Sequence, residues 1–134
     1  MKNIRIKPTE LLSTLWTVIL FNMIVRDLHE FLREGYISQM MTLDISQVEV
    51  LFYGFAAQAP ILMVLLSRIL KDKANKWYNT VAAVITSLGL LSTLPKADMD
   101  DVFFVIVQNI LLSIILRLSW KLDEKGKDLK LVEP

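Results

Sequence analysis

Cysteine is absent from this chain of 134 residues, and glycine and proline occur only four times each. Without a thiol there is no disulfide, no Cys-ligated metal and no thiol redox chemistry. The sequence also lacks a glycine-rich phosphate loop, a nucleophile elbow, an H-E-x-x-H motif and an EF-hand loop. A net charge of +1 without a basic stripe gives no support for nucleic-acid binding. We therefore expect no catalytic constellation, no metal, no cofactor and no nucleic-acid partner.

Long apolar stretches dominate what is present. Hydrophobic residues make up 54% of the chain, and in four stretches they run all the way round the helix instead of forming one face. Each stretch approaches the roughly 20 residues that a helix needs to cross about 30 Å of hydrocarbon. The sequence therefore predicts one all-α domain, a four-transmembrane-helix bundle. Its expected spans are about 9–34, 46–70, 76–94 and 100–121, followed by a charged cytoplasmic tail over 122–134.

Local signals agree with these four helices. Pro8 lies at the start of the first, where its missing N–H costs little. Ser46 and Glu49 have the S-x-x-E spacing of a capping box before the second. Asp100 and Asp101 place negative charge at the amino end of the fourth, where the helix dipole favours it. The predicted starts of these helices thus have local support.

The basic residues are unevenly distributed between the two sides of the predicted bundle. Such a bias sets the orientation of a membrane protein, with the basic side facing the cytoplasm. We therefore expect a multi-pass protein of the cell membrane with both the N-terminus and the C-terminus cytoplasmic. Twelve of the fifteen lie on one side: Lys2, Arg5, Lys7, Arg68, Lys71, Lys73, Lys76, Arg117, Lys121, Lys125, Lys127 and Lys130.

The outer end of the first helix carries a polar extension that is expected to reach about Glu34. Asn22, Arg26 and His29 share one side of this helix, because they follow its i, i+3 and i+4 spacing. A functional site would use Asp27 or His29 for protons and Arg26 for an anion. The alternative is a solvated helix end with pairs such as Arg26 and Glu30. A lone histidine does not predict a metal site.

Gln58 lies about ten residues into the second span, which places it near the bilayer centre. Pro60 follows two residues later and removes a backbone hydrogen bond. The small residues Gly54 and Ala57 would let another backbone approach closely. Gln58 either contacts a ligand or forms a hydrogen bond to a neighbouring helix.

The third and fourth spans add further polar side chains, among them Thr86 and Asn109. Lipid cannot satisfy such groups, so they are expected to face inward. One interpretation is a tight seam between helices. The other is a narrow, mostly apolar cavity with Gln58, Thr86 and Asn109 as its polar points. We expect Gln58 and Asn109 to point into the bundle, with Asn22 and Asp27 above them lining an outward-facing recess.

Several segments of the sequence form a recognisable set: Leu15-Trp16 with Asn22 and Asp27, Ala59 to Leu70, Lys76-Trp77-Tyr78-Asn79, and Thr80 to Ile85. Read together, they resemble a family of small prokaryotic four-helix membrane proteins that is known only as a domain of unknown function. The resemblance covers roughly residues 10 to 120 and implies the same four-helix architecture, without an activity or a site residue.

The sequence is consistent with three hypotheses for the function. The first is binding or passage of a small or lipid-like ligand through a cavity in the bundle or between the protomers of a homodimer. The second is a membrane-embedded enzyme that uses Asp27, His29 and Glu30 for acid–base work on a lipid-like substrate. The third is a structural or accessory membrane subunit. The lipid bilayer is a partner in all three.

Overall fold

The computed structural model describes the backbone of residues 6–132 and the side chains of residues 6–95 and 97–122. Over this part of the chain the fold is all-α, as predicted, and has no strand. In chain order the elements are α1 (Pro8–Phe31), α2 (Tyr36–Thr42), α3 (Gln47–Ile69), α4 (Asp72–Thr93), the short 3-10 turn η1 (Leu94–Lys96) and α5 (Met99–Val132).

The four long helices occupy ranges close to the expected ones, with four differences. Helix α4 starts at Asp72, four residues before the expected start at 76. The first helix ends at Phe31 instead of near Glu34. Gly35 then adopts a left-handed φ of 78°, which favours glycine, and starts the unexpected short helix α2. The backbone of α5 continues as a helix into the expected tail, as far as Val132. The polar extension of the first helix is therefore shorter than expected, but it includes His29.

The local signals at the helix starts are present in the structure. Pro8 is the first residue of α1. The hydroxyl of Ser46 accepts a hydrogen bond from the Glu49 backbone N–H at 3.3 Å, and the Ser46 N–H donates to Glu49 Oε2 at 2.9 Å. Asp100 and Asp101 lie in the first turn of α5. These caps confirm the predicted starts because they depend only on residues within one turn.

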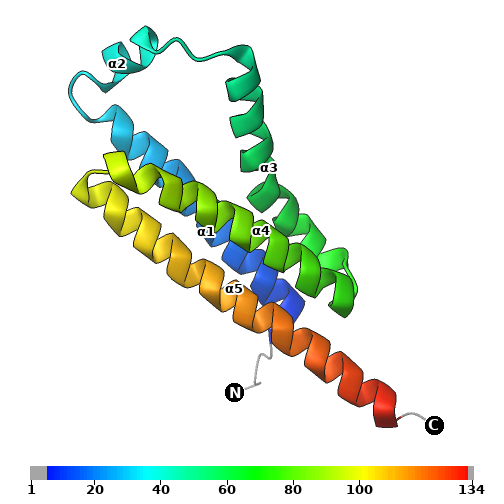
Figure 1. The fold of residues 1–134 in the computed structure, drawn as a ribbon. Coiled ribbons are helices and arrows are strands. Elements are labelled where there is room, and N and C mark those ends of the chain that lie inside the picture. Colours follow the sequence, from blue (N-terminus) through cyan, green and yellow to red (C-terminus); the bar gives the residue numbers. More distant parts are fainter. Residues whose placement is uncertain (1–5, 133–134) are drawn as a thin grey trace.

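The four long helices alternate in direction, and α1 lies between α3 and α5 (Figure 1). We call the end of the bundle with Pro8 and the α3–α4 connection at Leu70 the base. The opposite end, with Phe31, Gln47 and η1, is the mouth. Helix α4 packs along α5 and also contacts α3. This order brings residues from α1, α4 and α5 together at the mouth.

Helix α3 departs from this packing in its first half. Pro60, Met63 and Ser67 are buried, whereas every residue from Gln47 to Gln58 is exposed. Figure 1 shows the same half of α3 leaning away from the other helices. A proline inside a helix removes one backbone hydrogen bond and loosens the helix at that point. The bundle is therefore closed at the base and open between α1 and α3 at the mouth.

The core is formed by all four long helices, although α3 contributes to it only beyond Pro60. A single cluster of buried apolar side chains runs through the bundle. Its members are Leu12, Trp16, Ile19, Met63, Ala82, Ala83, Leu90, Val105, Leu112 and Ile115.

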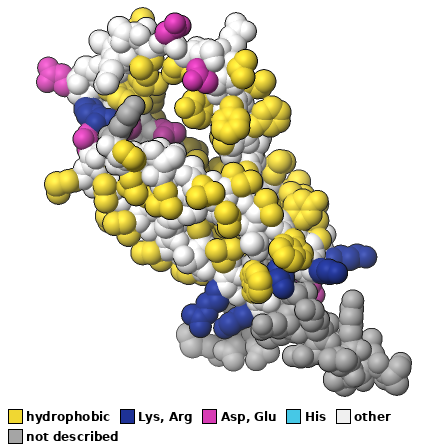
Figure 2. Space-filling model, in the orientation of Figure 1, with side chains coloured by type: hydrophobic (Ala, Val, Ile, Leu, Met, Phe, Trp, Pro, Cys, Tyr) yellow, Lys and Arg dark blue, Asp and Glu magenta, His cyan; other side chains and the backbone are white. Residues whose placement is uncertain are grey.

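Large apolar side chains also cover the outside of the molecule (Figure 2). Helices α1, α3 and the Met99–Leu122 part of α5 are long and apolar enough to cross a membrane. Helix α4, the third of the four predicted spans, does not meet this measure. Three of the four expected spans in the described residues thus have the length and apolarity of a span.

Candidate functional site

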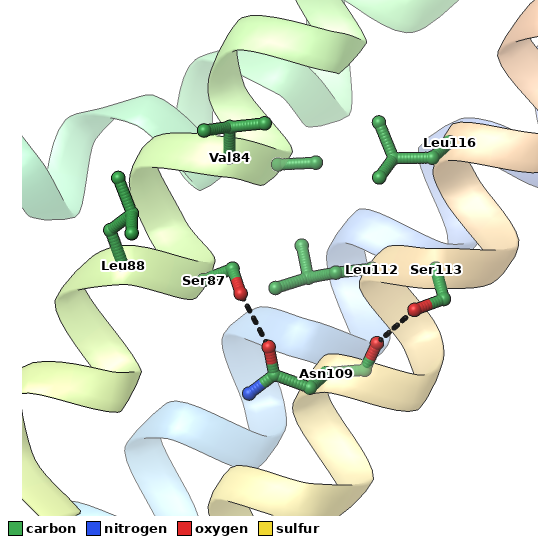
Figure 3. A pocket seen from close by; sticks show the side chains of 8 residues that line it. Val84, Ser87, Leu88, Asn109, Leu112, Ser113 and Leu116 are labelled. Carbon is green, nitrogen blue, oxygen red and sulfur yellow. Dashed lines mark hydrogen bonds between the residues drawn. The ribbon is translucent and has the colours of Figure 1, made fainter.

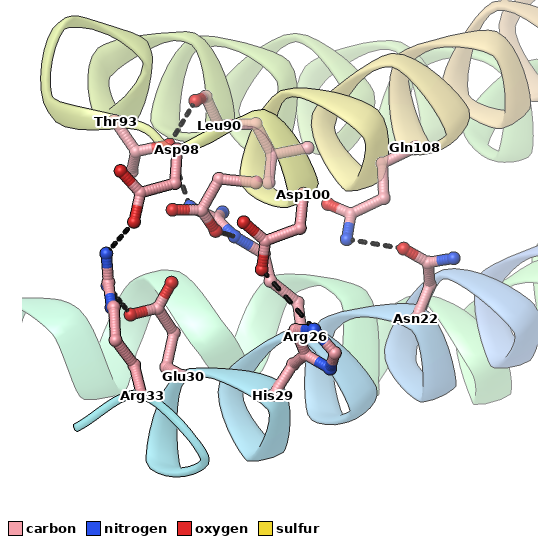
Figure 4. Close-up of polar contacts among 11 residues, drawn as sticks. Asn22, Arg26, His29, Glu30, Arg33, Leu90, Thr93, Asp98, Asp100 and Gln108 are labelled. Carbon is pink, nitrogen blue, oxygen red and sulfur yellow. Dashed lines mark hydrogen bonds and ion pairs between the residues drawn. The ribbon is translucent and has the colours of Figure 1, made fainter. Parts of the chain in front are cut away.

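The mouth of the bundle holds a cluster of charged residues from three elements (Figure 4). The Nε of Arg26 donates to Asp101 Oδ1 at 2.7 Å, and its NH2 donates to the hydroxyl of Thr93 at 3.1 Å. Asp101 is only 5% exposed. The alternative of a solvated helix end gave Arg26 and Glu30 as an example of a pair, but the structure pairs Arg26 with Asp101 of α5 instead. The ion pair joins α1 to α5, and the hydrogen bond to Thr93 joins α1 to α4.

A second ionic group lies one turn further toward the end of α1. Arg33 forms ion pairs with Glu30 and with Asp98. Partial desolvation lowers the pKa of Arg33, but its hydrogen bond to Glu30 and the nearby carboxylates raise it above its ordinary value. Arg33 is therefore a cation in the folded protein.

His29 lies beside this group, with Nε2 at 3.6 Å from Asp100 Oδ2. Its ring centroid is 6.2 Å from that of Phe104. A cavity of about 310 Å³ is lined by His29, Glu30, Leu32, Arg33 and Asp100. The cavity is open, and four of its five lining residues have ionisable side chains, among them His29 and Glu30, which the sequence singled out.

Asp27 is exposed and makes no hydrogen bond or ion pair to a described residue, unlike the mouth carboxylates of Glu30, Asp98, Asp100 and Asp101. On a regular helix it lies three turns after the buried Trp16, within about 20° of the same side. Met23, between them, is half-buried against the core. Asp27 therefore continues the inward side of α1 to the mouth, where α3 no longer covers it.

The interior amides form a link lower in the bundle. Gln108 is fully buried, and its Nε2 donates to Asn22 Oδ1 at 2.9 Å. This bond joins α5 to α1. Gln108 Oε1 and the hydroxyl of Thr86 are buried without a hydrogen-bond partner in the described structure. Asn22 and Thr86, both candidates from the sequence, thus lie inside the bundle.

Asn109 occupies a different place, in a groove between α4 and α5 (Figure 3). Its Nδ2 donates to the Val105 carbonyl at 2.8 Å, and its Oδ1 accepts a hydrogen bond from the Ser87 hydroxyl. The groove has a volume of about 150 Å³ and is otherwise mostly apolar. Asn109 is half-buried and serves the α4–α5 contact, so it does not share a cavity with Asn22.

The expectation that Gln58 points into the bundle is wrong. Gln58 is exposed and has no hydrogen-bond partner in the described structure. At about 100° per residue it lies about 140° round the helix from Met63, which is buried. The packing of Met63 and Ser67 on the other helices therefore turns Gln58 outward. The structure brings Arg26 and His29 together but leaves Gln58 apart.

A buried polar network at the base was missed by the sequence analysis. The indole N–H of Trp16 donates to Asn79 Oδ1 at 2.7 Å, and Asn79 Nδ2 donates to the Asn75 carbonyl at 2.8 Å. Asn75 Nδ2 donates to the Ser67 carbonyl at 2.8 Å. All four residues are fully buried. Trp16, Ser67 and Asn79 lie in the segments that carry the family resemblance, which was the available signal.

The same base holds a second link, between α1 and α3. Arg68 Nε donates to the Ser13 hydroxyl at 2.9 Å, and that hydroxyl donates to the Val64 carbonyl at 2.6 Å. Together with the Trp16 network, this link joins α1, α3 and α4. The base is therefore held by specific hydrogen bonds, whereas α3 has no such bond to another helix in its first half.

The described part of the protein is all-helical. Three of its helices are long and apolar enough to cross a membrane, hydrogen bonds join the helices at the base, and charged residues cluster at the mouth. A model of a family of unknown function, DUF6326, matches residues 3–127, and the chain belongs to that family. This match agrees with the resemblance to a domain of unknown function. No curated protein and no solved structure matches the chain.

Proposed function

We propose that this protein is a multi-pass protein of the cell membrane that binds a lipid-like ligand with a cationic head group. The three apolar helices and the one-sided distribution of basic residues support a membrane location with both termini in the cytoplasm. Helix α4 is the fourth span in this proposal. Its 22 residues extend over about 33 Å, and it packs along α5.

The binding region is the opening between α1 and the first half of α3. By helical register, Phe52 and Ala56 lie within about 20° of Met63, on the side of α3 that faces the bundle. Both are exposed, so no side chain of the described residues covers them. Figure 2 shows the molecule hollowed in this region, with acidic side chains near its rim. In this proposal the apolar chain of the ligand lies between the two helices.

The unpaired carboxylate of Asp27 is the observation that carries the choice of a cationic head group. Asp27 lies at the mouth end of the inward side of α1, next to the opening. The guanidiniums of Arg26 and Arg33 are already engaged by Asp101, Glu30 and Asp98. A ligand ammonium group can therefore pair with Asp27 without displacing an internal ion pair.

The acid–base enzyme has less support. Convergence of Asp27 or His29 with Glu49 would favour it, but Glu49 Oε2 accepts hydrogen bonds from both the N–H and the hydroxyl of Ser46. That carboxylate is engaged in capping α3. In the cavity at the mouth, His29 lies beside Asp100, and Glu30 is already paired with Arg33.

A binding assay with the purified protein in phosphatidylcholine nanodiscs tests the proposal. The probes are a dansyl-labelled dodecylammonium and a dansyl-labelled dodecyl sulfate with the same chain. We expect the ammonium probe to bind and the sulfate probe not to bind. Asp27→Asn should weaken ammonium binding about tenfold or more, because a charged hydrogen bond contributes about 1.5–3 kcal/mol.

Asp44→Asn is the matched control, since Asp44 is an exposed acid in the connection before α3. It should leave the affinity unchanged. Equal binding of both probes, or an ammonium affinity that Asp27→Asn does not change, would refute the proposed site.

A further inference from the structure

We propose that two copies of this chain associate through the outward face of α3, formed by Gly54, Ala57, Gln58, Ile61 and Leu65. The inference rests on the membrane location proposed above, and it concerns a surface opposite to the ligand opening. All five residues are exposed. Their i, i+3, i+4 and i+7 spacing places them along one side of the helix.

The face points away from the rest of the bundle. Met63 and Ser67 form the buried side of α3, and the face lies on the opposite side of the helix. A Cβ added at Gly54 would meet no atom within 4 Å. Because the face lies opposite Met63 and Ser67, it would still point outward if the first half of α3 closed onto α1.

Gln58 requires a partner on this face. It lies 11 residues after Gln47 in a helix of 23 residues, hence about 17 Å from the start and near the middle. An amide exposed to hydrocarbon without a hydrogen bond costs several kcal/mol, and lipid tails cannot supply one. No described side chain of the same chain reaches it. The partner must come from another molecule in the membrane.

The chemistry of the face selects a second copy of the same chain. All copies have the same orientation in a membrane, so a twofold axis runs along the bilayer normal and residues at equal depth meet. Gln58 then meets Gln58, and each amide supplies both the donor and the acceptor that the other lacks. The small residues Gly54 and Ala57 allow the close backbone approach that such a bond needs. The face has no charge between Glu49 and Arg68, so identical copies do not repel each other.

Cysteine cross-linking tests this interface directly, because the chain has no cysteine of its own. Gly54→Cys and Ile61→Cys are placed on the face, and Phe52→Cys is placed on the opposite side as the matched control. The variants are oxidised with copper phenanthroline in native membranes. We expect a covalent dimer of twice the chain mass from Gly54→Cys and Ile61→Cys only. Cross-linking of Phe52→Cys as efficient as that of Ile61→Cys, or products only with proteins of another mass, would overturn the proposal.

A second measurement covers the role of Gln58. The dimer fraction of labelled protein in nanodiscs is followed by energy transfer as the ratio of protein to lipid is varied. Gln58→Leu should weaken association about 3- to 15-fold, the range of interhelical hydrogen bonds in membranes. Gln58→Asn should retain most of it. An unchanged dimer fraction for Gln58→Leu would refute the amide pairing, and monomers at every protein-to-lipid ratio would refute the interface. Binding of the ammonium probe is measured separately, so refuting one proposal leaves the other open to its own test.

Discussion

Removal of the Asn79 side chain should weaken the base of the bundle strongly. Asn79 is fully buried, and its Oδ1 accepts hydrogen bonds from Trp16 Nε1 at 2.7 Å and from the Ser67 hydroxyl at 3.4 Å. In Asn79→Ala the indole N–H stays buried and loses its acceptor, which costs about 1–3 kcal/mol. The small cavity adds about 1 kcal/mol. We expect a loss of about 2–4 kcal/mol in the free energy of unfolding.

A double-mutant cycle with Trp16→Phe isolates the bond itself. Trp16→Phe removes the donor, so the two changes should not add, and the coupling should be about 1–2 kcal/mol. Unfolding is followed by far-UV circular dichroism during SDS titration in dodecyl maltoside micelles, because this signal does not depend on tryptophan. Trp77→Phe is the matched control: Trp77 is 54% exposed and should change stability by less than about 0.5 kcal/mol. Strict additivity, or an Asn79→Ala variant as stable as the parent, would show that the network does not hold the base.

Three further outcomes are expected. Arg26→Gln should cost about 3 kcal/mol of stability, because it leaves the buried Asp101 carboxylate unpaired, and Asp101→Asn in the same chain should restore part of the loss in the same titration. If Asp101→Asn does not reduce the loss of stability caused by Arg26→Gln, the pairing is contradicted. Thr86→Val should be neutral or stabilising by up to about 1 kcal/mol, since the buried hydroxyl has no partner, and a clear loss would reveal one. For topology, Met40→Cys should react with an impermeant maleimide in intact cells and Ala74→Cys only after permeabilisation; the reverse pattern would refute the proposed orientation.

The helices and their starts could be predicted because the forces involved act over short distances. The capping box of Ser46 and Glu49 depends on two residues within one turn, and the structure contains both of its bonds. Pro8 and the carboxylates at the start of α5 act in the same local way. Helix α1 ends at Phe31, four residues before Gly35, and the short helix α2 that starts after Gly35 had no comparable signal.

The partners of the charged and polar residues could not be predicted in the same way. Spacing along α1 favours Glu30 as the partner of Arg26, yet the structure pairs Arg26 with Asp101, which is 75 positions away. The bond between Trp16 and Asn79 spans 63 positions. Such pairs depend on which helices become neighbours, and no local pattern contains that information.

Gln58 shows most clearly what the sequence could not determine and only the tertiary structure decided. By itself the sequence determined that apolar helices form, where they start, and which residues share a side of each helix. It did not determine which side faces inward, because apolar residues run all the way round these helices and no single face is favoured. Only the packing of Met63 and Ser67 against neighbouring helices made that choice. It turned Gln58 outward and left the first half of α3 without a partner inside its own chain.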